Sequence, residues 1–253
     1  MLTPLLVIQI FSLFVTPVAV GVWFNRRLGL GWSLLFGGTL AFVAAWVIAN
    51  FVALPGELGL ALLSIAQIGA LYLVYRFQLR VSSEREALMV GVGLAGIELL
   101  LFGILAALSL AQMLPLRDAT DETIIELAAR IDDVSEEEVS LTRVYELQED
   151  IDDYWSTSWY VPLLQLTQSL AILPIQMALA VIVIGALADN SLRPLLYASV
   201  LHFLSRLLPI YGGIFGGVVV WFGLSLICGG IALAFLKRLR LDVQEQTVDL
   251  VAP

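Results

Sequence analysis

Apolar residues of this chain fall into seven long runs, and most of the runs are separated by polar or charged segments. A run of about 18 or more apolar residues crosses roughly 30 Å of hydrocarbon as an α-helix. We therefore predict an all-α, polytopic transmembrane helical bundle of about seven helices, at residues 3–23, 30–53, 57–77, 88–112, 161–187, 194–211 and 213–236. The sixth run is short and contains His202 and Arg206, so hydropathy supports it least.

The amino-acid composition agrees with a membrane domain. Hydrophobic residues make up 60% of the 253 residues and charged residues only 14%, and the mean hydropathy is +0.93. A soluble domain of this length cannot bury so much apolar surface. We expect a single membrane domain over residues 1–253, with the lipid bilayer as its surroundings.

Positive charges predict the orientation of this domain. With seven crossings, nine of the thirteen Lys and Arg residues lie on one side of the membrane, namely Arg26, Arg27, Arg76, Arg80, Arg85, Arg193, Lys237, Arg238 and Arg240. Lys and Arg are enriched in cytoplasmic loops. We therefore expect the N-terminus outside and the C-terminus in the cytoplasm.

One long loop carries most of the negative charge. Residues 115–158 contain fourteen acidic residues and three arginines, a local balance of −11. Such a run usually forms a solvated surface, and a surface that binds a cation or a partner is the alternative. Apolar stripes at 124–131 and 139–151 predict two short amphipathic helices within this extracytoplasmic loop.

Four polar side chains lie on four different apolar runs at a similar depth, roughly 15 Å from the predicted cytoplasmic ends. They are Gln67, Glu98, Gln176 and His202, and we expect them to meet near the bilayer midplane. An ionisable group at this depth is costly and by default indicates a site. A protonated glutamate or a satisfied core histidine is the structural alternative, and the two glutamines are more typical of hydrogen bonds between helices.

Prolines predict where the bundle opens. Pro162 and Pro174 lie in the fifth run, and Pro209 lies near the end of the sixth. Proline leaves backbone carbonyls unpaired inside a helix, and cavities of helical bundles tend to open at such positions.

The segment from Gly91 to Gly96 matches the dinucleotide-binding pattern Gly-x-Gly-x-x-Gly. It follows no predicted strand and lies inside an apolar helix, so the geometry that binds phosphate is absent. We interpret these glycines, like Gly212, Gly213, Gly216 and Gly217, as places where another helix approaches closely. We expect neither a nucleotide cofactor nor nucleic-acid binding.

Three short stretches together resemble a known family. They are the stretch from Gly91 to Glu98, the stretch from Gln168 to Gln176, and His202-Phe203-Leu204-Ser205-Arg206. Their spacing over residues 60–212 resembles that of the YhfC-type intramembrane metalloprotease family, which is related to the CAAX-processing and bacteriocin-processing membrane peptidases. The resemblance implies a multi-pass protein of a prokaryotic plasma membrane.

Most polar positions of that family have changed in this chain. By the resemblance, the positions that carry Glu, Glu, Arg, His, Glu, Arg, His and Asp in the family fall on Ala66, Gln67, Ala70, Leu94, Gln168, Ser169, Gln176 and Arg206. Only Glu98 and His202 keep the residue type. The active-site motifs are therefore degenerate.

The chemistry of zinc decides what these changes mean. Catalytic zinc needs about three protein ligands and an open position for water. Only Glu98 and His202 are suitable here, and Arg206, one turn from His202, opposes a dication. We expect no metal and no cofactor, and if zinc binds after all, Glu98 and His202 are its ligands. We expect Glu98, about 6 Å from Arg206 in depth, to form an ion pair with it instead.

The residues favour a catalytically degenerate member of the family. We expect a polar network at the ancestral site. Its members are Gln67, Glu98, Gln176, His202 and Arg206, with Gln168 as a further candidate. The expected function is that of a pseudoprotease, which binds or scaffolds transmembrane segments of other membrane proteins. An active intramembrane metallopeptidase with a non-standard site is one alternative. A small-molecule or ion transporter is the other, since midplane polar residues and helix prolines also suit transport.

Overall fold

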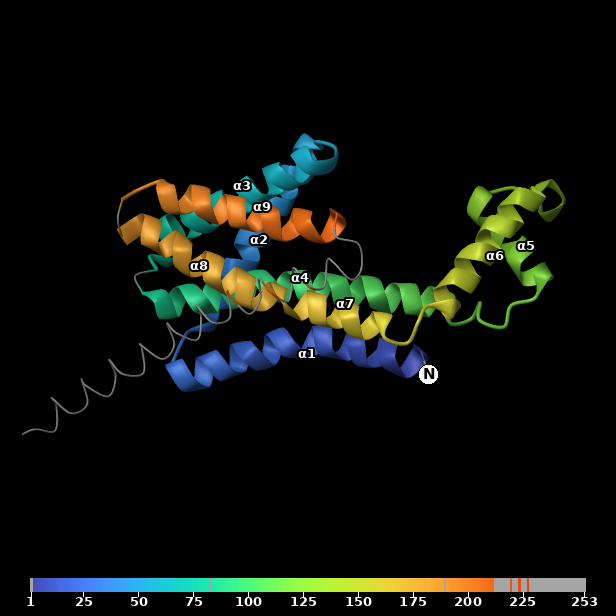
Figure 1. The fold of residues 1–253 in the computed structure, drawn as a ribbon, viewed down its shortest axis with the longest axis horizontal. Helices are drawn as coiled ribbons and strands as arrows, with labels where there is room; N and C mark the ends of the chain where they lie inside the picture. The colour runs from blue at the N-terminus through green and yellow to red at the C-terminus, as the bar shows by residue number, and fades with distance from the viewer. Residues whose placement is uncertain are drawn as a thin grey trace, which may run out of the picture.

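The computed structural model describes residues 2–81, 83–188 and 190–211, together with the single positions 219, 223 and 227. Every regular element in these residues is helical (Figure 1). In chain order they are α1 (Leu2–Leu28), α2 (Trp32–Val52), α3 (Gly56–Leu73), the π-helix η1 (Val74–Leu79), α4 (Glu84–Met113), α5 (Asp121–Asp132), the 3-10 turn η2 (Glu136–Glu138), α6 (Leu141–Ser156), α7 (Val161–Leu170), α8 (Ile172–Ala188) and α9 (Arg193–Tyr211). The prediction of an all-α fold is confirmed for this part of the chain.

In the described part of the chain, five helical segments are long and apolar enough to cross a membrane. They are Leu2–Leu28, Trp32–Val52, Gly56–Leu79, Glu84–Met113 and Val161–Ala188, and they correspond to the first five predicted runs. The sixth run forms α9, which is not among the five because Arg193, His202 and Arg206 lower its hydropathy. The predicted seventh run and its glycines lie outside the described residues, apart from single positions.

Helix α4 is the centre of the bundle. It packs against α1, α2 and α8, and 67% of its most apolar window is buried, compared with 22% for α1. The helix begins at Glu84 because Ser83 and Glu86 form a capping box. The Ser83 hydroxyl accepts from the Glu86 amide at 3.3 Å, and the Glu86 carboxylate accepts from the Ser83 amide at 3.1 Å.

Glycines set how closely the neighbouring helices approach α4. A Cβ added at Gly91 would lie 2.6 Å from the Cα of Met177 on α8. A Cβ at Gly93 would overlap the carbonyl of Leu35 on α2. The glycine pattern is therefore a contact between backbones on two sides of one helix, which confirms its interpretation as a packing motif.

The fifth predicted run is broken in two. Pro174 has no N–H to donate to the Leu170 carbonyl, and its ring would clash with that same carbonyl in a continuous helix. Helix α7 therefore ends at Leu170. The Ala171 amide donates to the Thr167 carbonyl at 3.1 Å at the break. The expectation that Pro162 leaves backbone carbonyls unpaired was wrong. This residue lies in the first turn of α7, where the backbone amides have no hydrogen-bond acceptor within the helix. Helix α9 continues through Pro209 to Tyr211.

The acidic loop forms a helical hairpin, as the apolar stripes predict. Helices α5 and α6 pack against each other, with Ile124, Ala128 and Ile151 buried. Thr120 and Ser140 cap their first turns by accepting from backbone amides at 3.4 and 3.2 Å. The hairpin extends beyond the bundle at the end where α1 begins (Figure 1).

Candidate functional site

Four helices bring polar side chains together in the interior of the bundle. Each helix contributes one residue: α3 contributes Gln67, α4 Glu98, α8 Gln176 and α9 His202. None of these residues is more than 3% exposed. Polar groups buried to this degree need hydrogen-bond partners within the protein. The hydrogen bonds among them, described next, confirm the prediction that these four residues meet.

Gln176 connects the other three. Its Oε1 accepts from Gln67 Nε2 at 3.0 Å. Its Nε2 lies 3.3 Å from Glu98 Oε2 and 3.5 Å from His202 Nε2, and it can donate to both. A carboxamide suits this position because it accepts at one atom and donates two hydrogens at the other.

His202 is held at both ring nitrogens. Because Gln176 donates to Nε2, the hydrogen of a neutral ring lies on Nδ1, which is 2.9 Å from the Ser64 hydroxyl oxygen. Ser64 in turn donates to the carbonyl of Leu60 at 2.8 Å. Sequence reasoning missed Ser64. Its signal was weak: a serine one turn before Gln67, on the same face of an apolar helix.

Arg206 closes the network by pairing with Glu98. Its Nη1 is in contact with Glu98 Oε1, and the pair is held by charge and not by a regularly aligned hydrogen bond. The two side chains are 16% and 4% exposed, respectively. The predicted ion pair is confirmed. One oxygen of Glu98 faces a cation and the other an amide donor, an arrangement that suits an ionised carboxylate.

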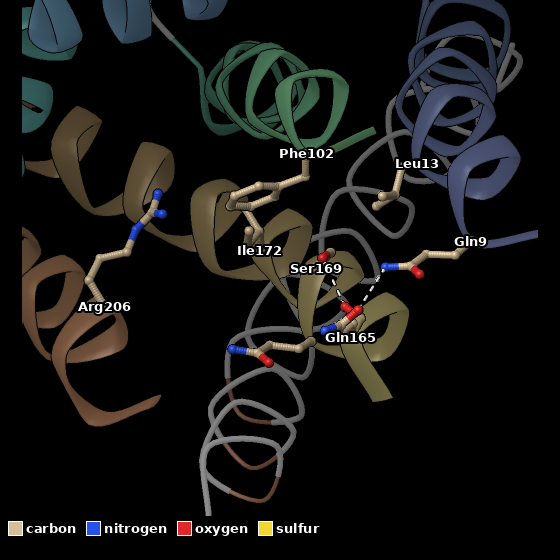
Figure 2. A pocket seen from close by; sticks show the side chains of 8 residues that line it. Gln9, Leu13, Phe102, Gln165, Ser169, Ile172 and Arg206 are labelled. Atoms are coloured by element: carbon tan, nitrogen blue, oxygen red, sulfur yellow. Dashed lines mark hydrogen bonds between the residues drawn. The ribbon is translucent and has the colours of Figure 1, made fainter. Parts of the chain in front are cut away.

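Arg206 also borders a cavity of about 280 Å³ (Figure 2). Among the described residues, its polar lining comprises Gln9 from α1, Gln165, Gln168 and Ser169 from α7, and Arg206 from α9. Leu13, Phe102 and Ile172 form the apolar part. The cavity adjoins the break between α7 and α8, near the place where Pro174 predicts an opening.

Gln168 therefore lines the cavity, whereas the other predicted residues form the buried network. Sequence reasoning did not single out Gln9 or Gln165, whose amides interact across α1 and α7 with Nε2 of Gln9 3.4 Å from Oε1 of Gln165. Gln9 is an isolated glutamine in an apolar segment, and Gln165 lies one turn before Gln168. Only the packing of α1 against α7 indicates that they belong together.

The residues at the network do not fit a zinc centre. Among residues 2–81, 83–188 and 190–211, no group of three or more His, Cys, Asp and Glu side chains could hold a metal ion. Both oxygens of Glu98 and both nitrogens of His202 already have protein partners. Zinc would have to displace a guanidinium and an amide donor to reach only two ligands, fewer than a catalytic site uses.

The described residues thus form an all-helical fold around a buried polar network, and several of its helices are long and apolar enough to span a membrane. Comparison of the chain with protein-family models, curated proteins and solved structures gives no match.

Proposed function

We propose that this protein is a non-catalytic pseudoprotease of the YhfC type, which binds or scaffolds transmembrane segments of other membrane proteins. The observation that carries the proposal is the contact of Arg206 with Glu98. A metallopeptidase needs a metal at this carboxylate and a general base beside the metal-bound water. A fixed guanidinium occupies that side of Glu98 instead.

The proposed topology has seven crossings, with the N-terminus outside and the C-terminus in the cytoplasm of a prokaryote. This orientation puts nine Lys and Arg residues on the cytoplasmic side. It also puts the acidic hairpin outside, at the end of the bundle where α1 begins (Figure 1). The buried network then lies near the bilayer midplane.

The metal content of the purified protein tests the loss of catalysis. We expect elemental analysis in detergent to find well below one zinc per chain. A variant with Leu94→His and Arg206→Asp should gain zinc, because it adds two ligands near Glu98 and His202 and removes the opposing charge. Stoichiometric zinc in the unaltered protein would overturn the pseudoprotease proposal and favour an active peptidase with a non-standard site.

Binding itself is tested with hydrophobic transmembrane peptides of about 20 residues. With protein and peptide in one nanodisc, we expect saturable energy transfer between labels on the two, and mass spectrometry should find the peptide intact. Control peptides of the same length with charged residues at the centre should not bind. Cleavage would contradict the absence of catalysis, and lack of saturation for every peptide would contradict a binding role.

One observation favours a transporter as the second candidate. The break between α7 and α8 borders a polar cavity, and interrupted helices beside a polar site are typical of secondary transporters. Solute flux in proteoliposomes without peptide binding would favour this second candidate over the first.

A further inference from the structure

We infer that the cavity beside Arg206 binds an uncharged amide group, of the kind found in a peptide bond. This inference deepens the proposed function, on which it rests for the identity of a polypeptide ligand. The cavity lies between α1, α4, α7, the start of α8 and α9 (Figure 2), and Arg206 is the one residue of the buried network among its described lining.

Gln9 provides an acceptor that has no partner. The residue is only 6% exposed, and its Oε1 makes no hydrogen bond in the part of the chain that the structure describes. A buried carbonyl oxygen without a donor is unfavourable by an amount comparable to a lost hydrogen bond. A ligand N–H in the cavity would satisfy it.

Arg206 provides the complementary donors. A guanidinium has five N–H groups, and among the described residues Arg206 pairs only with Glu98. The remaining N–H groups suit a carbonyl oxygen in the cavity. Gln165 and Gln168 add amides that can serve as donor or acceptor.

The charge balance excludes a strongly charged ligand. Among the described residues that line the cavity there is no carboxylate, so an ammonium group has no counter-ion among them. The charge of Arg206 is neutralised by Glu98, and an anionic ligand would have to compete for the guanidinium and leave a buried carboxylate unpaired. A neutral ligand with an N–H at Gln9 and a C=O at Arg206 satisfies both residues and leaves the ion pair intact.

The size and the apolar wall define the rest of the ligand. About 280 Å³ is small compared with sites for drug-sized molecules. Leu13, Phe102 and Ile172 offer a surface for one apolar side chain. One amino-acid unit fits this description, either as a small capped amide or as one unwound position of a polypeptide.

Binding of small probes to the full-length protein in detergent tests the inference. N-acetyl-leucine amide should bind, as measured by calorimetry, at least tenfold more tightly than N-acetyl-leucine, which carries a carboxylate in place of the second amide. An isosteric Gln9→Met variant should bind the amide roughly tenfold more weakly, the loss expected for one buried hydrogen bond. Gln112→Met, outside this cavity, should bind it normally.

The stability of the free variants separates ligand binding from a structural role. Gln9→Met removes an oxygen that has no partner, together with the long 3.4 Å contact of Gln9 Nε2 with Gln165 Oε1, so the melting temperature of the free protein should fall no further than in Gln165→Met, which loses the same contact. Equal binding of the amide and the carboxylate would overturn the inference. So would undiminished binding of the amide to Gln9→Met, or absence of amide binding to the unaltered protein.

A transmembrane peptide as competitor identifies the source of the amide. Mutual displacement of peptide and N-acetyl-leucine amide supports a polypeptide ligand at this cavity. If the small amide binds and no peptide does, the inference holds for a small molecule and the proposed function fails. If the peptide binds equally to the unaltered protein and Gln9→Met and is not displaced, the proposed function holds and the inference fails.

Discussion

Replacing Glu98 by glutamine is expected to lower the free energy of unfolding by about 3 kcal/mol. Glutamine keeps the size of the side chain and an oxygen for Gln176, but it leaves the charge of Arg206 without a partner. Because both side chains are largely buried, water cannot replace the lost carboxylate. Unfolding in detergent, followed by circular dichroism, measures the change.

Two further variants isolate the charge as the cause. Combining Glu98→Gln with Arg206→Met removes both charges, and stability should return to within about 1 kcal/mol of the unaltered protein. Glu126→Gln makes the same exchange in the exposed pair with Arg130 and should change stability by less than about 0.5 kcal/mol. An unfolding midpoint of Glu98→Gln equal to that of the unaltered protein would contradict a stabilising ion pair.

Alanine at the helix contacts of α4 is the second change with a large expected effect. In Gly93→Ala, the added methyl group would overlap the Leu35 carbonyl, and in Gly38→Ala it would overlap the Val90 carbonyl. Backbone atoms cannot turn aside as a side chain can, so α2 and α4 must separate. We expect each variant to lose about 2–3 kcal/mol of stability.

Gly69 and Gly185 provide matched controls in helices α3 and α8. Outside its own helix backbone and chain neighbours, a methyl group at either position meets no atom of the described residues within 4 Å. Alanine there should leave stability unchanged or raise it by up to about 1 kcal/mol, because alanine favours helix more than glycine does. If Gly93→Ala and Gly69→Ala unfolded alike, close backbone approach would not explain the glycine motif.

Hydropathy and depth were sufficient to predict much of the fold and the buried network. The first five runs were found because a span needs a minimum length of apolar residues. Glu98 and His202 were recognisable because polar groups are rare in such runs. Their equal depth indicated that Gln67 and Gln176 would meet them.

The parts that sequence reasoning missed depend on how helices rotate and pack. Depth does not say which residue connects the others, so the central place of Gln176 was not predicted. Ser64 is small and common in membrane helices, and its bond to His202 depends on the crossing of α3 and α9. Gln9 and Gln165 face each other only because α1 packs against α7.

The position of Gln176 between Glu98 and His202 also bears on proton transfer between these two residues. Proton relays in membranes run through side chains such as carboxylates and imidazoles, which accept a proton at one atom and release another. The Gln176 amide forms hydrogen bonds to both neighbours but does not exchange protons in this way. The carboxylate and the imidazole are therefore joined through an amide, which connects their helices but does not give the direct acid–base contact that a carboxylate–imidazole pair would.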